Sequence, residues 1–391
     1  MYLAGAIALL SFLATYNCFI LNEFKNVNGE PLVFNTIKDD PCTITLAESI
    51  PWNLTYPTGS PSFPSTFLVW YDLLTSAKSK VLLSAFYWTL RGVDFGFEHP
   101  SMKPGETVFA LMQSLASTVD LSISQSGPQK PSSNTDLDLL AAAGAKVSYV
   151  DVSRLLGTGI LHTKLWAIDS RHGYLGSANM DFRSLTQVKE LGLGIFNCPT
   201  LIEDMEKIFG AYFLASGPSA KLPLDFPPQL ATIYNKTNPL VMNVNGRPTS
   251  MYLTMSPPEF APPGRTHDLD ALLSVIKEAR KFIYISVMDY SPQLVFYGSR
   301  PNTFWPLIDD ALRQAAVDRG VEVRLLISKW KYTAPSIDHF LASLHAINGI
   351  TNTSMRVRRF IVPAYDEFQR KLDHARVNHN KYMVTDNTVF I

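Results

Sequence analysis

Charge is scarce in this sequence, and neither sign is in excess. Charged residues make up 17% of the 391 positions, below the roughly 25% of an average soluble domain, and Lys plus Arg and Asp plus Glu both number 34. This balance excludes a global basic surface, so any nucleic-acid binding must be local. A hydrophobic content of 46% favours a well-packed secreted or lumenal protein over a disordered one, and the length suffices for two domains.

Charge is absent altogether from residues 2–21, which read YLAGAIALLSFLATYNCFIL. The run has about the ~20 residues that a membrane-spanning helix needs. No basic segment precedes it and no small-x-small cleavage site follows it. Residues 1–21 are therefore interpreted as an uncleaved membrane anchor in preference to a cleaved signal peptide, with a buried core helix as the third alternative. The first two place the remainder on the lumenal side of the endoplasmic reticulum, Golgi or endolysosome, either membrane-anchored or as a soluble mature form.

Cysteine is also scarce, with three residues in the chain. Cys18 lies in the apolar N-terminal run, which leaves Cys42 and Cys198 for the lumenal part. An oxidising compartment favours joining these two, and two buried free thiols are the alternative. Three Asn-x-Ser/Thr sequons also suit a lumenal protein and are predicted glycosylation sites, namely Asn53, Asn235 and Asn352.

An internal repeat organises the rest of the chain. Residues 73–88 align without gaps on residues 275–290, and further helix–strand pairs follow in both halves. Alternating helices and β-branched strands predict an α/β fold of two pseudo-two-fold-related lobes, each a mixed sheet flanked by helices. The predicted divisions are a stalk at 22–65, the first lobe at 66–222, a proline-rich linker without a long helix at 223–263, and the second lobe at 264–391.

The repeat predicts the same four elements in each half. In the first half they are helices at about 105–117 and 135–144 and strands Val119–Ser124 and Val147–Val150. In the second half they are helices at about 304–319 and 336–347 and strands Val321–Ser328 and Val357–Val362. A strand that carries a repeated sequence motif follows these elements in both halves.

The motif is H-x-K-x₄-D. Its two copies share a histidine, a lysine and an aspartate, which are His162, Lys164 and Asp169 in the first and His379, Lys381 and Asp386 in the second. Strand periodicity puts the His and Lys of one copy on the same face, about 6–7 Å apart, a separation into which a phosphate fits. A lone histidine in an apolar strand is usually structural, but two matches at corresponding places of a repeat favour function. Two such strands facing each other would surround one phosphate with two histidines and two lysines.

This residue set predicts a phosphodiesterase. One histidine attacks phosphorus and forms a phosphohistidine, while the other donates a proton to the leaving oxygen and then activates water; His162 is the favoured nucleophile. The lysines bind the non-bridging oxygens and neutralise charge in the transition state, so the prediction includes no metal and no other cofactor. Asp169 and Asp386, at the strand ends, belong to the candidate catalytic set but are expected to support structure or orient neighbours rather than react.

Three further polar residues follow the first motif. Ser177 and Asn179, in the segment Gly-Ser-Ala-Asn, can donate hydrogen bonds to phosphate oxygens. Glu190, in a further strand, is predicted to accept the Nδ1–H of His162, which would fix the tautomer of that ring and raise its basicity. His374, close to the second motif, is interpreted as structural.

With these residues the chain resembles the phospholipase D superfamily, and most of all its animal lumenal branch of type II membrane proteins with 5′-exonuclease activity on single-stranded nucleic acid. The resemblance covers roughly residues 40–391 and rests on GILHTKLWAIDSRHGYLGSANMDFRSLTQVKELG (159–192), SAFYWTL (84–90), RGVEVRLLIS (319–328) and ARVNHNKYMVTDNTVFI (375–391). It implies a lysosomal or endolysosomal phosphodiesterase with an acidic optimum, a phosphohistidine intermediate and a single-stranded nucleic acid substrate. It also implies a Cys42–Cys198 disulfide and catalytic or phosphate-contacting roles for His162, Lys164, Asn179, His379 and Lys381.

Two other functions stay open beside this one. The same branch is linked to transphosphatidylation of lysosomal phospholipids, so a lipid phosphodiesterase is the second hypothesis. The family continues beyond the second motif with Gly-x-Ser-Asn, further strands and a final helix, whereas this chain ends at Ile391. We therefore expect a C-terminally truncated gene model or isoform of an active-type enzyme. A truncated, inactive, membrane-anchored binding protein is the third hypothesis.

Overall fold

The computed structural model describes residues 42–96, 98–128, 135–294 and 302–391. The apolar run at 2–21, with its predicted membrane helix, lies outside these residues. Among the helices in the described ranges, none is long and apolar enough to cross a membrane. Residues 42–54 and 61–391 belong to one folded unit, which contains both sheets.

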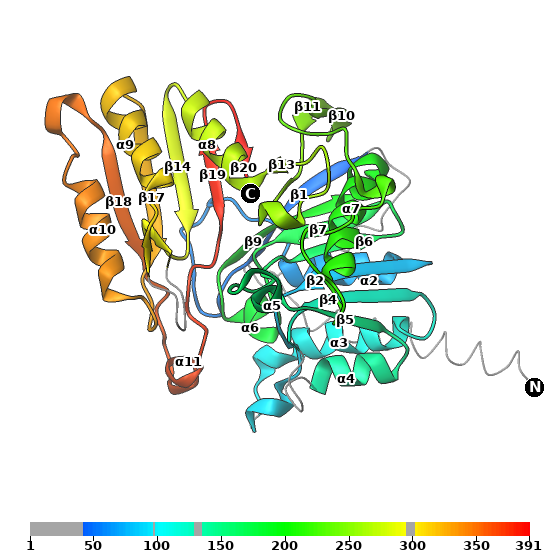
Figure 1. Cartoon of the computed structure of the whole chain (residues 1–391). Helices are drawn as coiled ribbons and strands as arrows, with labels where there is room; N and C mark the ends of the chain where they lie inside the picture. The colour runs from blue at the N-terminus through cyan, green and yellow to red at the C-terminus, as the bar shows by residue number, and fades with distance from the viewer. Residues whose placement is uncertain (1–41, 97, 129–134, 295–301) are drawn as a thin grey trace, which may run out of the picture. The chain divides into compact units, whose positions relative to one another are not determined.

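A seven-stranded mixed sheet forms the first lobe (Figure 1). Its strands, in spatial order, are β1 (Thr43–Ser49), β9 (Glu190–Phe196), β7 (His172–Gly176), β6 (Leu165–Ile168), β2 (Lys80–Ala85), β4 (Asp120–Ser126) and β5 (Lys146–Val150). β2, β4 and β5 run parallel, whereas β6, β7, β9 and β1 pair antiparallel with their neighbours.

Helices cover both faces of this sheet. All four residues of β6 are buried, and they alternate between the two faces. Trp166 packs on Trp70 of α2 (Thr66–Ser76), with ring centroids 4.7 Å apart, while Leu165 belongs to a core cluster with residues of α7 (Pro199–Ala215). The other elements of this lobe are α3 (Lys103–Leu115), α4 (Thr135–Ala142), α5 (Val152–Leu156), α6 (Phe182–Thr186), the short strands β3 (Trp88–Thr89) and β8 (Met180–Asp181), and 3₁₀ turns at Gly92–Phe95 and Pro100–Met102.

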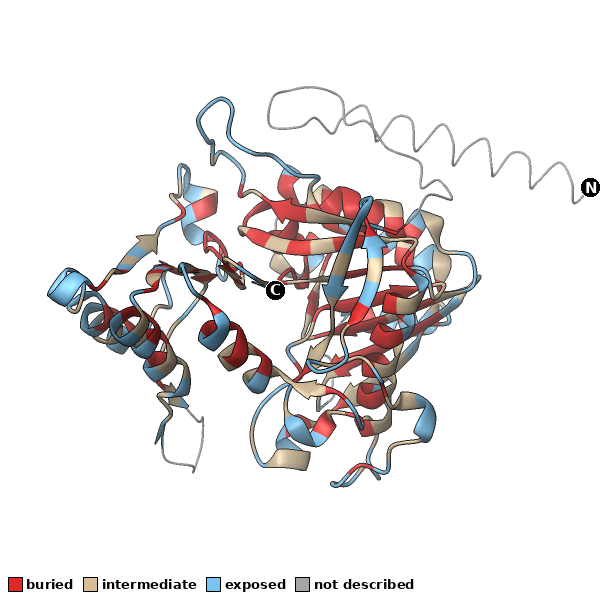
Figure 2. Ribbon diagram, turned by 90° about the horizontal axis from the view of Figure 1, so that it is seen from above, coloured by how far each residue is buried: buried red, intermediate tan, exposed pale blue. Residues whose placement is uncertain are grey.

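A five-stranded sheet forms the second lobe. Its spatial order is β18 (Met355–Phe360), β17 (Glu322–Ser328), β14 (Phe282–Val287), β19 (Tyr382–Thr385) and β20 (Val389–Phe390). Three helices pack on one face of this sheet: α8 (Asp268–Glu278), α9 (Leu307–Arg319) and α10 (Pro335–His345). Apolar residues at alternate positions of the strands form one core cluster with the apolar residues of these helices. Figure 2 shows buried residues on the facing sides of these helices and strands. α11 (Glu367–Lys371), the β15–β16 pair (Gln293–Leu294 and Thr303–Phe304) and a 3₁₀ turn at Ile350–Asn352 complete the lobe.

The internal repeat is present in the structure with the predicted register. Strands β2 and β4 begin at residues 80 and 120, and β14 and β17 begin at residues 282 and 322, the same offset of 202. Each of the eight predicted helices and strands lies within three residues of the observed element at both ends. The prediction of two α/β lobes with a shared element order is therefore confirmed.

The proline-rich segment at 223–263 contains no long helix, as predicted, but it is not a free linker. It forms a hairpin of β10 (Leu240–Val244) and β11 (Arg247–Met251), the short strand β12 (Thr254–Met255), which pairs with β13 (Thr266–His267), and 3₁₀ turns at Pro228–Leu230 and Pro258–Phe260. Leu240 and Phe260 are buried in the first-lobe core. Just beyond the segment, Arg265 forms a buried ion pair with Asp204 of α7 at 2.8 Å. The linker prediction is corrected accordingly: the segment packs on the first lobe.

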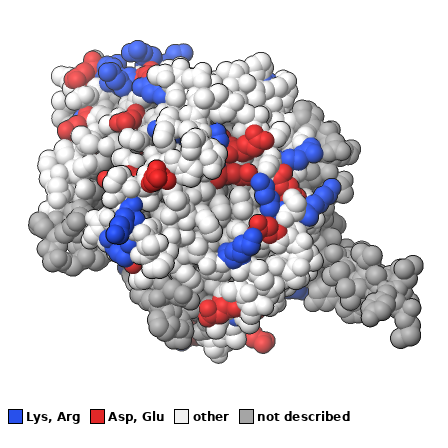
Figure 3. Space-filling model, turned by 45° about the vertical axis from the view of Figure 1, so that its right-hand side comes forward, with Lys and Arg blue, Asp and Glu red and all other residues white. Residues whose placement is uncertain are grey.

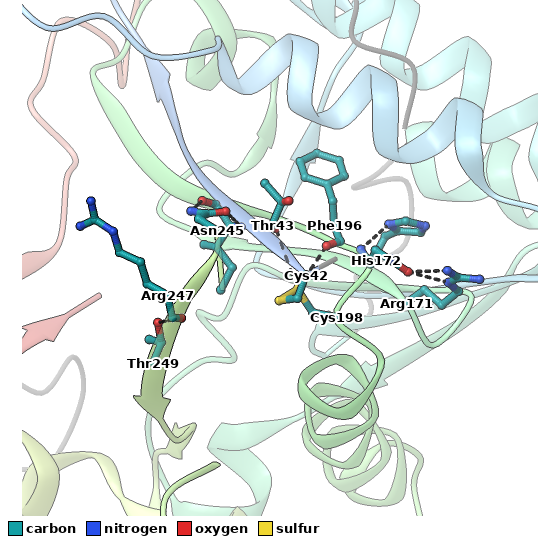
Figure 4. The surroundings of a disulfide bond; sticks show 11 residues. Cys42, Thr43, Arg171, His172, Phe196, Cys198, Asn245, Arg247 and Thr249 are labelled. Carbon is teal, nitrogen blue, oxygen red and sulfur yellow. Dashed lines mark hydrogen bonds between the residues drawn. A yellow bond between two sulfur atoms is a disulfide. The ribbon is translucent and has the colours of Figure 1, made fainter. Parts of the chain in front are cut away.

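Part of the predicted stalk is a strand of the first sheet. β1 pairs with β9 in seven registered positions, so the first lobe begins well before residue 66. No local sequence pattern indicated this pairing, because the partner strand β9 lies far along the chain. Cys42 and Cys198 flank the β1–β9 ladder and form the disulfide that the resemblance implied (Figure 4). The side chain of Asn245, in the β10–β11 turn, accepts from the N–H of Ile44 at 3.1 Å and donates to its carbonyl at 2.8 Å, which closes the free edge of β1.

The surface carries its charges in mixed clusters. On the face drawn in Figure 3, acidic and basic side chains are interspersed and wide areas are uncharged. Two of the three predicted glycosylation sites, Asn53 and Asn352, are exposed at positive-φ turn positions. Asn235 is half-buried, and its side chain donates to the Gly264 carbonyl at 3.0 Å. Glycosylation at these asparagines stays a prediction.

Candidate active site

Each motif histidine lies just ahead of a strand and not within it. β6 begins at Leu165 and β19 at Tyr382, so the prediction of a strand through the His and Lys positions is wrong at those residues. The ladder with β2 reaches only as far as Leu165, and the preceding chain leaves the sheet. Outside the sheet, side chains need not alternate between faces. Lys164 Nζ accordingly lies 3.2 Å from His162 Nδ1, much closer than strand periodicity predicted for these two residues.

A serine at a corresponding place holds each motif segment. Ser126, the last residue of β4, accepts a hydrogen bond from the N–H of Leu161 at 3.1 Å. Ser328, the last residue of β17, accepts one from the N–H of Asn378 at 3.0 Å. α/β proteins place their ligand sites at the carboxyl ends of parallel strands, and both serines lie at such ends. The repeat therefore presents both histidines at the same kind of position.

The second motif segment is also bonded to the first lobe. The N–H of Lys189 donates to the carbonyl of Val377 at 2.9 Å, and the N–H of His379 donates to the carbonyl of Lys189 at 2.8 Å. Lys189 and Asn378 form an isolated parallel bridge. This pairing brings Glu190, the next residue of the first lobe, beside the ring of His379.

Glu190 orients His379, which corrects the prediction that it orients His162. The Nδ1 of His379 lies 2.8 Å from Glu190 Oε2, and both side chains are buried. Burial alone would raise the pKa of Glu190, but the neighbouring His379 and Lys381 outweigh it and lower that pKa. The ionised carboxylate therefore accepts the Nδ1–H and leaves Nε2 as the reactive ring nitrogen.

The His162 ring has different neighbours. It packs against Phe86, with ring centroids 4.8 Å apart, and contacts Lys164 as described above. The ring is open to solvent, yet the surrounding protein atoms, and after them the charges of Lys164 and Lys381, lower its pKa. In the free protein His162 is thus held in the neutral form.

Two lysine ammonium groups are buried beside these rings. Lys164 is buried, and burial lowers its pKa well below the usual value, with the charge of Lys381 adding to the effect. Burial also lowers the pKa of Lys381, to about 7. Its Nζ is shielded from solvent and has no hydrogen-bond partner among the residues the structure describes. A buried ammonium group without a partner is costly, so the site is built to receive an anion.

Two adjoining cavities meet at His162. One, of 440 Å³, is lined by both motif histidines together with Asn179, Arg183, Trp330 and His374. The other, of 250 Å³, is lined by His162, Lys164, Lys381 and Ser177. The four residues of the two H-x-K pairs therefore line two adjoining cavities that share His162.

A family model described as "PLD3/4, PLD-like domain" matches residues 59–365 of this sequence. The chain belongs to the phospholipase D-like family. The human 5'-3' exonuclease PLD3 is 47% identical over 354 residues, which cover 90% of this chain and 71% of that protein. The mouse 5'-3' exonuclease PLD4 is 41% identical over 356 residues, 90% of this chain and 70% of that protein. The solved phosphatidylserine synthase of Haemophilus influenzae is 12% identical and covers 82% of this chain and 74% of its own, with a TM-score of 0.49, too low to support a structural argument.

The two motif aspartates of this phospholipase D-like chain lie away from the cavities. Asp169 accepts hydrogen bonds from the backbone N–H groups of Lys78, Ser79 and Lys80 at 2.7–2.9 Å, at the start of β2. Asp386 does the same for Arg280, Lys281 and Phe282 at 2.9–3.4 Å, at the start of β14. Their inclusion in the catalytic set is corrected, since their carboxylates join two strands of each sheet at the end remote from the histidine.

One of the polar residues after the first motif, Ser177, has a role that differs from the predicted one. Ser177 was expected to contact phosphate, but its hydroxyl donates to Glu190 Oε2 at 2.6 Å. Ser184, which no sequence pattern singled out, donates to Glu190 Oε1 at 2.9 Å. Asn179 lines the larger cavity, and its Oδ1 is buried without a partner in the described ranges, so it stays a candidate substrate contact.

No three His, Cys, Asp or Glu side chains of the described residues are grouped as metal ligands would be. The prediction that the reaction needs no cofactor stays a prediction.

Proposed function

We propose that this protein is a phosphodiesterase that removes nucleotides from the 5′ end of single-stranded nucleic acid. The observation that carries the proposal is the pair of H-x-K segments around two adjoining cavities, with the ammonium group of Lys381 buried and unpaired by any described residue. A phosphodiester is an anion whose oxygens would pair with both lysines. The names of the human and mouse relatives, 5'-3' exonucleases, support the choice of nucleic acid and of direction.

The reaction uses the two rings in two steps. The Nε2 of one histidine attacks phosphorus and forms a P–N bond, while the P–O bond to the leaving oxygen breaks and the other ring, as its cation, protonates that oxygen. The second ring, now neutral, then takes a proton from water, whose oxygen attacks phosphorus and breaks the P–N bond. Lys164 and Lys381 bind the non-bridging oxygens throughout and offset the charge that develops on them.

The electrostatics of the site favour an acidic optimum. Burial lowers the pKa of His379, and surrounding protein atoms lower that of His162, so the cationic acid that the first step needs is populated only at low pH. Lys381, with a pKa of about 7, is fully charged only below that value. Binding of the phosphodiester anion raises all of these pKa values. Activity is therefore expected to fall as the pH rises through neutrality.

We further propose that the protein acts in an oxidising, acidic endolysosomal lumen, anchored through residues 1–21. The Cys42–Cys198 disulfide supports an oxidising compartment, since such bonds are rare in the cytosol. The two exposed sequons, Asn53 and Asn352, are compatible with a glycosylated lumenal protein.

The test uses the purified full chain and single-stranded DNA labelled at one end. At pH about 5, below the ordinary histidine pKa of ~6.5, we expect successive release of nucleotides from the 5′ end and none from a substrate with a blocked 5′ end. His162→Ala and His379→Ala serve as inactive controls. A chain that binds the DNA without cutting it would replace the proposal with an inactive binding protein.

A phospholipid phosphodiester is the second candidate substrate. A cavity of 770 Å³ with mostly apolar side chains shares Leu175, Leu191 and Ile391 with the smaller cavity that holds the lysines. An acyl chain could occupy such a space while its phosphodiester reached Lys381. Phosphatidylglycerol vesicles in the same assay distinguish the two substrates, since release of glycerol or exchange of the headgroup would favour the lipid.

A further inference from the structure

Aromatic side chains that the phosphodiesterase chemistry does not use form one wall of the 440 Å³ cavity at the two histidines. Trp330 and His374 line it together with His162 and His379. Tyr332 does not line the cavity but stacks on His374, with ring centroids 4.8 Å apart and planes 19° from parallel. Trp330 meets Tyr332 edge-on, with centroids 4.9 Å apart. The three rings thus form one contiguous cluster beside the reactive histidines.

The turn that carries Trp330 and Tyr332 is held by its own hydrogen bonds. It follows β17, so it lies at the carboxyl end of the parallel strands, as the motif segments do. The N–H of Trp330 donates to Thr333 Oγ1 at 3.0 Å, and the N–H of Thr333 donates back to the carbonyl of Trp330 at 3.1 Å. α10 then begins at Pro335, which fixes the end of the turn.

Asp373 joins this turn to the segment of His374. Its Oδ1 accepts from the hydroxyl of Tyr332 at 2.8 Å and from Lys331 Nζ at 2.5 Å. Its backbone carbonyl accepts from Arg183 Nη1 of the first lobe at 2.7 Å. The aromatic cluster is therefore fixed from both lobes before any ligand arrives, which reduces the entropy lost on binding.

Two of the three rings nevertheless remain exposed, and the third, Trp330, is half-buried. Tyr332 is 43% exposed and His374 is exposed. Aromatic side chains that serve only to fill a core are buried, as Trp70 and Trp166 are in the first lobe. Rings that are fixed, solvent-facing and adjacent to a phosphate site offer flat π surfaces to a planar group attached to that phosphate.

We propose that Trp330, Tyr332 and His374 form a stacking platform for a nucleobase next to the phosphate that is cleaved. This inference rests on the proposed function, and the platform would determine which substrates the site selects. Every nucleobase has a π face, so stacking binds single strands with little preference for sequence. An internal base of a duplex has both faces covered by stacked neighbours, so the platform also favours single strands. The larger cavity, at 440 Å³, lies in the range of pockets that hold small ligands.

The test compares oligonucleotides that keep their phosphates but lose one base. Single-stranded DNA carries a tetrahydrofuran abasic unit at the first, second or third position from the 5′ end, and kcat/KM is measured with the full chain. For one of these positions we expect a loss of about tenfold or more, the size of one base–aromatic stack. Tyr332→Ala and His374→Ala should remove this discrimination, so that kcat/KM on the complete substrate falls to the value measured on the abasic one. His374→Phe, which keeps a flat ring, should preserve it.

Phe213→Ala is the matched control, because Phe213 is 47% exposed on α7 and does not line the cavity. Equal cleavage of base-containing and abasic substrates by the unaltered chain would overturn the platform and leave the exonuclease proposal standing; this measurement needs no variant to fold. Loss of activity on both substrates in His374→Ala, with His374→Phe equally impaired, would also overturn it, since it indicates a structural role. If the unaltered chain cleaves no oligonucleotide, the proposed function falls and the platform with it.

Discussion

The His162 and His379 segments share one backbone design and differ in what their rings contact. In both, a serine at a strand end holds the segment and an aspartate joins the two strands at the far end. The ring of His379 is bonded to Glu190, which two serines support in turn. The ring of His162 contacts Lys164 and Phe86 instead. The repeat therefore sets where each histidine lies, while the neighbours of each ring, across the lobes for His379 and mainly within the first lobe for His162, set its protonation.

The largest expected effect comes from removing either ring. Since one histidine attacks and the other transfers the proton, His162→Ala and His379→Ala should each lower kcat by at least about 10³-fold. The chain with both substitutions should be no slower than either single variant, because residues that act as one unit are not additive. Single-turnover assays on labelled DNA measure this. Substantial activity in one variant alone would show that the two halves do not share a single centre.

Glu190→Gln tests the difference between the rings directly. The amide keeps the size of the carboxylate but loses its charge, and a loss of about 10–100-fold in kcat is expected for such a supporting residue. The charge of Glu190 raises the pKa of His379, so its removal lowers that pKa further. The fall of activity with rising pH should therefore occur at a lower pH than in the wild type.

A pH–rate profile of Glu190→Gln provides the measurement, and Glu203→Gln, which changes an exposed carboxylate of α7 that lines neither histidine cavity, provides the control. An unshifted profile with reduced kcat would mean that Glu190 only holds the fold.

The disulfide is a second difference between the lobes, because it joins two strands of the first sheet and has no counterpart among the described residues of the second. Replacing Cys198 by Ala should cost about 2–5 kcal/mol of unfolding free energy, the usual effect of removing a native disulfide. The site is not in contact with the bond, so kcat of the remaining folded protein should stay close to the wild-type value. Denaturant unfolding followed by activity gives both numbers. A kcat that fell in proportion to the stability would contradict this separation.

The smallest effect is expected at the two aspartates, where the halves are most alike. Asp169→Asn and Asp386→Asn should each lower the melting temperature without changing kcat. Backbone N–H groups lower the pKa of Asp386 to about 2, from an unfolded value near ~3.9. Its stabilising effect is thus present above the unfolded pKa and is lost as the pH falls through the folded one. Thermal melts at pH 5 should show the full difference between variant and wild type, and melts near pH 2 a reduced one.

Local patterns predicted what the repeat encodes, and contacts distant in sequence account for the rest. The offset of 202 between equivalent strands and the pairing of the two H-x-K segments follow from the sequence. The partner of Glu190 could not be predicted from the sequence, because it depends on the backbone bridge at Lys189, which forms only when the lobes pack together. β1 was assigned to the stalk for the same reason, since its partner β9 is distant. Ser184 carries no signal of its own among the many serines of the chain.

The bridge between Lys189 and Asn378 has a consequence for how the protein is made. The first lobe emerges from the ribosome with His162 in place. Glu190 can form its hydrogen bond only after His379, which lies 189 residues further along, has been synthesised. Domains that fold during synthesis fold from the N-terminal side first. The proposed cutting activity therefore cannot start on a partly synthesised chain. Turnover appears only after the His379 segment has docked on the first lobe, so enzyme activity reports that docking step.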